Sequence, residues 1–323
     1  MAGPNTNFNQ LSATVRDHFL GKYRELVFNA APALGMFLKG GSRPRGGAKI
    51  RQPVTYQQSK DGAFFDYATL PTAGEDKHTA SEWEWKLYSQ HFTISIPEIR
   101  RSSGPEAVYR LLDLGTKTSL SALRDAIATD MFYLSGTSVY GDSDAQIHSL
   151  PGLISNNTWP AAATIGNIPK SNSWWQGQVV DGGGSFDYTH LTELYWDCAD
   201  GNDLPTAAFC HNVNADVIDD VAVTAGERFI RNPGQGAMNK FGVAPQITHV
   251  KGVPLYVDRH CDVDHVYMLR MEDFDLAIHK DDNFRFEGFK KPEDKYVQVG
   301  FWHFMGDLTV LDPRRSGVIY NVT

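Results

Sequence analysis

Cysteine is scarce in this 323-residue chain, which contains only Cys198, Cys210 and Cys261. None of the three belongs to a C-x-x-C pair, so the sequence argues against a disulfide framework and against a structural zinc site. Long apolar runs are also missing, because the nearest candidate, residues 30–38, is interrupted by a proline and a glycine and falls short of the roughly 18 residues of a membrane span. The polar start MAGPNTNFNQ lacks the features of a secretory signal, so we expect a protein made in the cytoplasm.

An excess of basic residues is missing as well. The 38 Asp and Glu residues outnumber the 30 Lys and Arg residues, which gives a net charge of -8. A dedicated nucleic-acid-binding protein has a basic surface, so any contact of this chain with nucleic acid has to be local. Hydrophobic residues make up 41% of the chain and charged residues 21%, a composition that predicts a folded protein rather than a disordered one.

No complete catalytic or cofactor motif occurs. The patterns G-x-S-x-G, H-E-x-x-H and S-x-x-K are absent. The segment 232–240 ends in a lysine that neither follows a glycine nor precedes Ser or Thr, so it does not match a phosphate-binding loop. The segment 258–265 has the residue types of a metal site, but Cys261 and His265 lie in a predicted turn and no second ligand pair has zinc-like spacing. We therefore predict a protein that is not an enzyme and that uses no metal or other cofactor.

Two distinctive segments open the chain. Apolar residues recur at helical spacing from about residue 10 to 28, which predicts an amphipathic helix with Leu11, Val15 and Phe19 on its apolar face. A proline and a glycine follow and are expected to loosen this helix. Residues 39–49, KGGSRPRGGAK, combine four glycines and a proline with four basic residues, so we expect an exposed and mobile connection.

Residues 50–96 are predicted to form a long β-hairpin. In its second half, Trp83, Trp85 and Leu87 alternate with polar residues and are predicted to share one face. An isolated hairpin cannot bury such a face, so we expect this face to pack against a neighbouring subunit or the rest of the fold. Stacking of the tryptophans on a carbohydrate or on single-stranded nucleic acid is the alternative, although the neighbouring glutamates disfavour a nucleic-acid groove.

A long helix and a mixed α/β region follow the hairpin. Pro105 is typical of a first helical position, and apolar residues repeat every three or four residues as far as Gly136, which predicts a helix long enough to act as a spine. Two shorter helices are predicted at 188–198 and 214–229, with a short apolar strand at 206–210 between them.

The last quarter of the chain, residues 247–315, is predicted to consist of short, aromatic-rich strands. Val297, Val299 and Phe301 alternate with Gln298 and Gly300, which predicts a strand with the apolar set buried. Together with the preceding helices, these strands indicate an α+β fold.

Four short motifs carry a resemblance to a known family: Gly152-Leu153-Ile154 after the long helix, the Trp174-Trp175 pair, Lys251-Gly252-Val253-Pro254, and the closing Pro313-Arg314-Arg315-Ser316-Gly317. With the order of arm, hairpin, long helix, α/β unit and terminal strands, they resemble the major capsid proteins of tailed bacteriophages. The resemblance covers essentially the whole chain. It implies the Hong Kong 97-type capsid fold.

The resemblance also implies a division of the chain into an N-terminal arm (1–46), an extended hairpin loop (47–93), a peripheral domain with the spine helix (94–184), an axial domain (185–287) and terminal strands of the peripheral domain (288–323). In this family the extended loop lies over a neighbouring subunit, and the axial domain surrounds the symmetry axis of a capsomer. We therefore expect intersubunit contacts from the loop and the arm, at Trp83, Trp85, Leu87, Leu11, Val15 and Phe19.

The implied function is structural. The chain is expected to assemble in the host bacterial cytoplasm into hexameric and pentameric capsomers, and these into the icosahedral head shell of a virion that encloses double-stranded DNA. Four basic residues, Lys39, Arg43, Arg45 and Lys49, are expected to make weak, sequence-independent contact with that DNA. No long charged helical segment precedes the arm, so the resemblance implies a separate scaffolding protein or a processed precursor, with a portal and decoration proteins as further partners.

Two alternatives stay open from the sequence. An encapsulin-like nanocompartment shell protein has the same fold but encloses protein cargo instead of a genome. A stand-alone carbohydrate- or metal-binding β-rich protein belongs to a different class and would behave as a discrete monomer.

Overall fold

The computed structural model describes residues 31–44, 46–57, 76–101, 105–134, 145–159, 164–184, 186–224, 249–293 and 295–322. The helices in these ranges are α2 (Pro32–Gly40), α3 (Ile96–Arg101), α4 (Pro105–Phe132), α5 (Leu150–Leu153), α6 (Tyr188–Cys198), α7 (Asn212–Thr224) and the 3-10 turns η1 (Ser173–Trp175), η3 (Met271–Asp273) and η4 (Pro313–Arg315). The strands are β1 (Ile50–Thr55), β2 (His78–Trp83), β3 (Lys86–Ser95), β4 (Thr164–Ile165), β5 (Ile168–Pro169), β6 (Gln178–Asp181), β7 (Ala207–Cys210), β8 (His249–Val250), β9 (Val253–Val257), β10 (Val266–Leu269), β11 (Phe274–Ile278), β12 (Arg285–Lys290), β13 (Val297–Val310) and β14 (Gly317–Tyr320). The predicted α+β class is confirmed.

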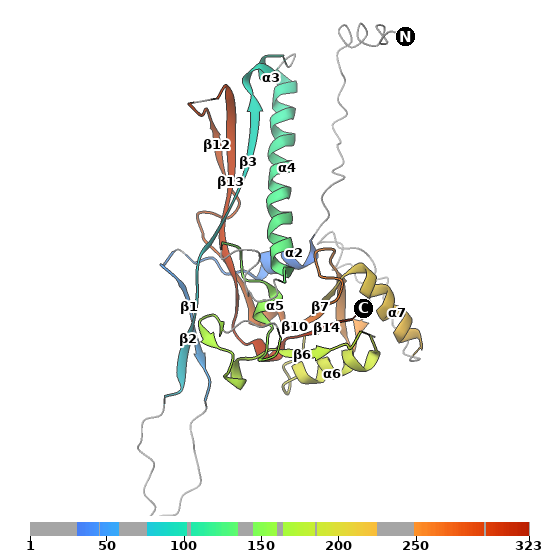
Figure 1. Ribbon diagram of the computed structural model, residues 1–323. Coiled ribbons are helices and arrows are strands. Elements are labelled where there is room, and N and C mark those ends of the chain that lie inside the picture. Colours follow the sequence, from blue (N-terminus) through green and yellow to red (C-terminus); the bar gives the residue numbers. More distant parts are fainter. Residues whose placement is uncertain are drawn as a thin grey trace, which may run out of the picture.

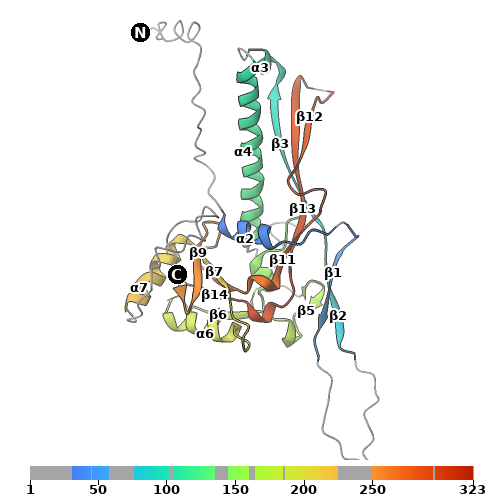
Figure 2. The same cartoon turned by 180° about the vertical axis from the view of Figure 1, so that it is seen from behind.

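The molecule is elongated, with a blade above a wider base (Figure 1). The blade consists of α4 and the strands β3, β12 and β13, which stand side by side in both views (Figure 2). The base contains a second sheet with α6 and α7 beside it, and the β1–β2 pair extends from the base as a separate arm. This shape leaves much of the blade and of the β1–β2 pair without a covering layer from the described part of the same chain.

Two sheets organise these parts. The base sheet has the strand order β6-β14-β10-β7-β9-β8, with β6–β14 and β7–β9 parallel and the other pairs antiparallel. In the blade, the long strand β13 pairs with β3 on one edge, while β11 and β12 occupy successive stretches of its other edge. Strand β13 therefore runs from the blade into the base and joins the two parts.

Helix α4 packs along the blade sheet and confirms the predicted spine. Its 28 residues span about 42 Å at about 1.5 Å per residue. The Trp302 indole Nε1 donates to the Thr116 carbonyl over 3.1 Å, and a Cβ atom added at Gly115 would lie 2.2 Å from the ring of Phe92. The sheet and the middle of the helix are therefore in direct van der Waals contact. Farther along, Leu123 and Ile127 are buried in the main hydrophobic core.

A second hydrophobic cluster lies in the base, between α6 and the strands β7, β9, β10 and β14. The predicted helix at 188–198 coincides with α6, and the predicted strand at 206–210 is β7. Helix α7 begins at Asn212, two residues before the predicted start, and the predicted end at residue 229 lies outside the described residues. These assignments came from apolar periodicity, which the structure confirms in this region.

The predicted long hairpin is only partly correct. Strands β1 and β2 do pair antiparallel, from Ile50 opposite Trp83 to Thr55 opposite His78. The second half of the predicted hairpin, however, is interrupted at Glu84 and Trp85, and β3 pairs with β13 instead of with the first half. The hairpin is therefore shorter than expected, and its predicted tip lies outside the described residues.

The segment from Pro32 to Lys49 also differs from the prediction. Pro32 does not loosen a helix but occupies the first turn of α2, where its missing N–H has no cost. The connection after α2 has no regular structure, as expected, but it is held against β11, because the Ser42 amide donates to Asp275 Oδ1 and the Ile278 amide donates to the Ser42 carbonyl. Most of the described part of this connection is exposed, as predicted, and its mobility stays a prediction. The predicted helix at 10–28 lies outside the described residues.

The three cysteines are buried and free. Burial raises the pKa of the Cys198 thiol, so this group stays protonated and unreactive near neutral pH.

Among the described residues, every helix is either too short or too polar to cross a membrane.

We predict that Leu123→Ala and Ile127→Ala each destabilise the subunit by about 2–5 kcal/mol, because each leaves a cavity where a side chain is 2% and 0% exposed. Urea unfolding of dissociated subunits measures the change. Leu114→Ala is the matched control on the same helix, since Leu114 is 39% exposed and its truncation is expected to change stability by about 0.5 kcal/mol or less. Equal effects at positions 114 and 123 would show that α4 is not packed as described.

Candidate functional site

The blade sheet has one face on α4 and one face turned away from it. Phe92 of β3 and Trp302 of β13 both point at α4, as their contacts with Gly115 and Thr116 show. Since successive side chains of a strand alternate between faces, the odd-numbered residues of β3 and β13 point the other way. We call this second surface the outer sheet face, and it consists of Leu87, Ser89, His91, Arg285, Glu287, Val299, Phe301, His303 and Met305.

The outer sheet face combines exposed apolar groups with charged groups. Leu87 is 70% exposed and lies opposite Met305 in the β3–β13 register. The Phe301 and His303 rings stack with 6.0 Å between their centroids. A solvated sheet face normally presents polar residues, whereas this one has an exposed leucine beside a half-buried methionine and a half-buried phenylalanine.

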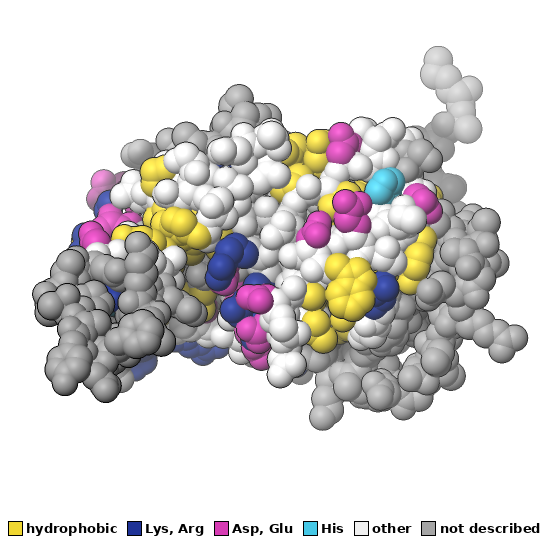
Figure 3. All heavy atoms as spheres, turned by 90° about the horizontal axis from the view of Figure 1, so that it is seen from below, with side chains coloured by type: hydrophobic (Ala, Val, Ile, Leu, Met, Phe, Trp, Pro, Cys, Tyr) yellow, Lys and Arg dark blue, Asp and Glu magenta, His cyan; other side chains and the backbone are white. Residues whose placement is uncertain are grey.

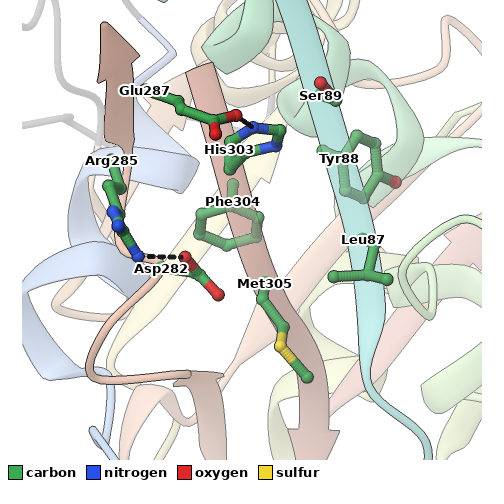
Figure 4. Close-up of a pocket in the computed structure, with 9 residues that line it drawn as sticks. All are labelled: Leu87, Tyr88, Ser89, Asp282, Arg285, Glu287, His303, Phe304 and Met305. Atoms are coloured by element: carbon green, nitrogen blue, oxygen red, sulfur yellow. Dashed lines mark hydrogen bonds and ion pairs between the residues drawn. The ribbon is translucent and has the colours of Figure 1, made fainter. Parts of the chain in front are cut away.

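A cleft of about 460 Å³ opens on this face (Figure 4). Leu87 and Met305 lie on neighbouring strands at one end, and ion pairs lie on the β12 side. Asp282 pairs with Arg285 at 3.6 Å, and the His303 Nε2 atom lies 3.2 Å from Glu287 Oε2. Hydrogen bonds from Lys290 and His303 lower the pKa of Glu287. The cleft therefore offers an apolar floor with a charged rim, the usual arrangement of a protein-binding surface.

Trp83 does not belong to this surface, so its predicted role as an intersubunit contact is wrong. Its side chain is 1% exposed and packs edge-on against His148 at 5.0 Å within the subunit core. The indole Nε1 donates to Ser81 Oγ over 3.1 Å, and a Cβ at Gly166 would lie 2.7 Å from the ring. Every side of the ring is thus in contact with the same chain.

Trp85 and Leu87 also do not share a face with Trp83, because β2 ends at Trp83 and the alternation does not continue through the break before β3. Trp85 is half-buried, donates to the Gly47 carbonyl over 2.8 Å and contacts the His279 ring at 5.5 Å. The contacts of Trp85 and Leu87 with a neighbouring subunit stay predictions. The other predicted contacts, Leu11, Val15 and Phe19, lie outside the described residues.

The outer face of β13 was missed as a functional surface. The alternation of Val297, Val299 and Phe301 was interpreted as a buried face, and the strand itself is confirmed. Between Val297 and Met305, however, the buried positions are the even-numbered Gly300 and Phe304, and every position from Gly306 to Val310 is buried. A Cβ at Gly300 would lie 2.7 Å from the Phe286 ring. The space beside Gly300, where a side chain is missing from the strand, is therefore occupied by the aromatic ring of Phe286.

The predicted basic patch is partly described. Lys39, Arg43 and Lys49 are exposed, whereas Arg45 lies outside the described residues. Lys49 pairs with Glu82 at 3.2 Å, so part of its charge is compensated. On the lower face of the molecule, the basic side chains in the middle of the view lie next to acidic ones (Figure 3).

Asp203 compensates two basic residues, because it pairs with Arg270 at 3.0 Å and with Arg315 at 2.7 Å.

Within the described ranges, no group of three or more histidine, cysteine or acidic residues is arranged to hold a metal ion.

No protein-family model matches the sequence, and no curated protein matches it significantly. Solved structures match over the whole chain. The subunit of the cyanophage A-1(L) capsid is similar at a TM-score of 0.71 and 15% identity, over 98% of this chain and 99% of that chain. The capsid subunit of a native GTA particle has a TM-score of 0.67 and 10% identity, over 100% of both chains.

The encapsulin SrpI of Synechococcus elongatus PCC 7942 is similar at a TM-score of 0.58 and 13% identity, over 100% of this chain and 96% of that chain. Further matches are structures from Mycobacterium phage Adephagia and Gordonia phage Cozz, with TM-scores of 0.57 and 0.60. The chain therefore has the fold of tailed-phage major capsid proteins, the Hong Kong 97-type fold, as the sequence motifs predicted.

We predict that Trp83→Ala destabilises the isolated subunit by about 3–5 kcal/mol, because it empties a fully buried site. Leu87→Ala is the matched comparison and is expected to change the free energy of unfolding by about 0.5 kcal/mol or less, since its side chain is mostly in solvent. Denaturant unfolding of dissociated subunits measures both. A Trp83→Ala subunit as stable as the wild type would restore the original assignment of this residue to an intersubunit contact.

Proposed function

We propose that this chain is the major capsid protein of a tailed bacteriophage and that it assembles into the icosahedral head shell around double-stranded DNA. The likeness to phage capsid subunits along the full length of the chain is the observation that carries the proposal. The role is structural, as it is for the shell proteins that the chain resembles, and the proposal involves no catalytic step.

The occupant that we propose for the outer sheet face is a second copy of this chain. Leu87 and Met305 form its apolar part, and the Glu287, His303 and Arg285 charges surround that part. The β1–β2 pair supports the same proposal, since a two-stranded ribbon is marginally stable by itself and gains from packing on a neighbour. Trp85 at the base of this ribbon is the second proposed contact.

The division into arm, extended loop, peripheral domain and axial domain belongs to this proposal. Residues 94–184 and 288–323 would form the peripheral domain, which includes α4 and β13 of the blade together with β6 and β14 of the base sheet, and residues 185–287 would form the axial domain. Strands β6 and β14 of the proposed peripheral domain pair with each other, and β14 also pairs with β10 of the proposed axial domain. The two domains would therefore share one sheet within a subunit.

The proposed partners beyond the shell are the packaged DNA, a separate scaffolding protein, a portal and decoration proteins. For the DNA, we propose weak and sequence-independent contact through Lys39, Arg43, Arg45 and Lys49, with the virion as the final location. Binding of purified protein to unrelated DNA sequences at several salt concentrations tests this contact, and tight binding to one sequence would contradict it.

An encapsulin-like shell is the second candidate, because an encapsulin subunit is among the structures that match the whole chain. Electron microscopy of purified particles, with assays of their nucleic acid and protein content, separates the two candidates. We expect closed shells that package DNA when they assemble in infected cells. Small shells filled with one enzyme would favour the encapsulin, and a monomer at all concentrations would contradict both.

We predict that Leu87→Asp blocks or strongly weakens shell assembly and leaves the subunit folded, because it places a charge in the proposed intersubunit contact. Burying an unpaired carboxylate costs several kcal/mol, and each shell contains the contact many times. Negative-stain microscopy and light scattering measure assembly, and circular dichroism measures folding.

Val263→Asp is the control for the effect of added charge, because Val263 is an exposed apolar residue, 38% accessible, in the turn before β10. Normal assembly of the Leu87→Asp variant would show that the outer sheet face is not an intersubunit contact. Loss of assembly in the Val263→Asp variant as well would show that the effect is not specific to this face.

A further inference from the structure

A buried histidine lies between two carboxylates where three parts of the subunit meet. His260 follows β9, and its side chain is 4% exposed. Its Nδ1 atom lies 2.9 Å from Asp258 Oδ1, and its Nε2 atom lies 2.8 Å from Asp125 Oδ1. Asp125 belongs to the spine helix α4, so the imidazole bridges the turn after β9 to that helix.

Two hydrogen bonds of this kind require a charged ring. An ionised carboxylate only accepts hydrogen bonds, and a neutral imidazole has one N–H donor and one lone pair. With a neutral ring, either Asp258 or Asp125 would face a lone pair at under 3 Å. The geometry is therefore that of an imidazolium with one N–H donated to each carboxylate, and such charge-assisted hydrogen bonds are the strong ones.

The same cluster holds the first turn of α2. The Ala33 amide at the start of α2 donates to Asp258 Oδ2 over 3.2 Å. The residue before the helix, Ala31, has no side chain that could accept such a bond. Asp258 thus serves as the N-terminal cap of α2 from a distant part of the chain, and its other oxygen accepts from His260.

The charges around the ring favour its protonated form. Burial by itself lowers the pKa of His260, but the hydrogen bonds and charges of Asp258 and Asp125 raise it, and the net direction is upward. The groups that face the ring are Asp125 from α4 and Asp258 from its own turn. The nearby Asp262 pairs instead with His265 at 3.5 Å.

We propose that His260, Asp125 and Asp258 form a pH-sensitive clamp that fixes α2 to the spine helix while His260 is protonated and releases it when the ring loses its proton. A group whose folded-state pKa is raised contributes stability that is fully present below its unfolded pKa and is lost as pH rises through the folded value. The clamp is therefore closed below about pH 6.5, the ordinary value for histidine, and opens progressively at higher pH. Residues 1–30 precede α2, so the clamp controls how firmly the N-terminal end of the chain is anchored.

Hydrogen exchange at α2 tests the clamp. The protection factor of residues 32–40, corrected for the intrinsic pH dependence of exchange, is measured by mass spectrometry on full-length subunits from pH 6 to 9. We expect protection to fall by up to about tenfold per pH unit above pH 6.5 and then to level off above the folded pKa of His260. Constant protection across this range would overturn the proposal.

Two variants separate the clamp from general instability. In Asp125→Asn, the amide can donate to a neutral His260 while the other ring nitrogen still donates to Asp258, so we expect α2 to stay protected at high pH and the pH dependence to disappear. In His260→Gln, both N–H donors sit on one nitrogen, which cannot reach the two carboxylates that the imidazole contacts through separate nitrogens, so we expect low protection of α2 at every pH.

His78→Gln is the matched control, because His78 is an exposed histidine on β2, and this variant should keep the wild-type pH profile. A wild-type profile in the Asp125→Asn variant would show that another group controls α2. The clamp lies within one subunit, so these outcomes are independent of whether the chain forms shells.

Discussion

The contact between α4 and the blade sheet at Gly115 determines how the rest of the subunit is arranged. A side chain at this position would overlap the Phe92 ring, and the neighbouring Thr116 carbonyl accepts from Trp302. Glycine within a helix costs about 1 kcal/mol relative to alanine, and here it allows a helix and a sheet to approach within direct contact. Because this contact places Phe92 and Trp302 inside, it also places Leu87, Phe301 and Met305 outside. The proposed assembly surface is thus a direct result of the internal packing.

Much of the fold could be predicted from the sequence, because the long elements have strong periodicity. Pro105 and the apolar repeat that follows it located α4 to within a few residues at each end. The same reasoning located α6 and β7, whose apolar residues face one cluster in the base. The family resemblance came from short motifs in a fixed order, and comparison with solved structures confirmed the fold that these motifs implied.

The candidate site was harder to predict, because two side-chain patterns depended on long-range contacts. Trp83 and Leu87 lie four residues apart and would share a face in one continuous strand, but β2 ends between them and each segment pairs with a different partner. In β13, the sequence cannot show that Phe286 fills the space above Gly300, so the apolar set on the opposite side was taken for the buried one. Both errors arise from reading one strand without its neighbours, since burial in a sheet depends on what covers each face.

The cap of α2 has a consequence for the order in which the chain becomes structured during synthesis. Ala33 and Asp258 are 225 residues apart, so the ribosome completes α2 well before it makes the carboxylate that holds its first turn. At about 5–20 residues per second, this delay is roughly 10 to 45 s. The spine helix is also made before Asp258, so Asp125 waits for the same late segment. The anchorage of the N-terminal end is therefore among the last contacts that a nascent subunit can form.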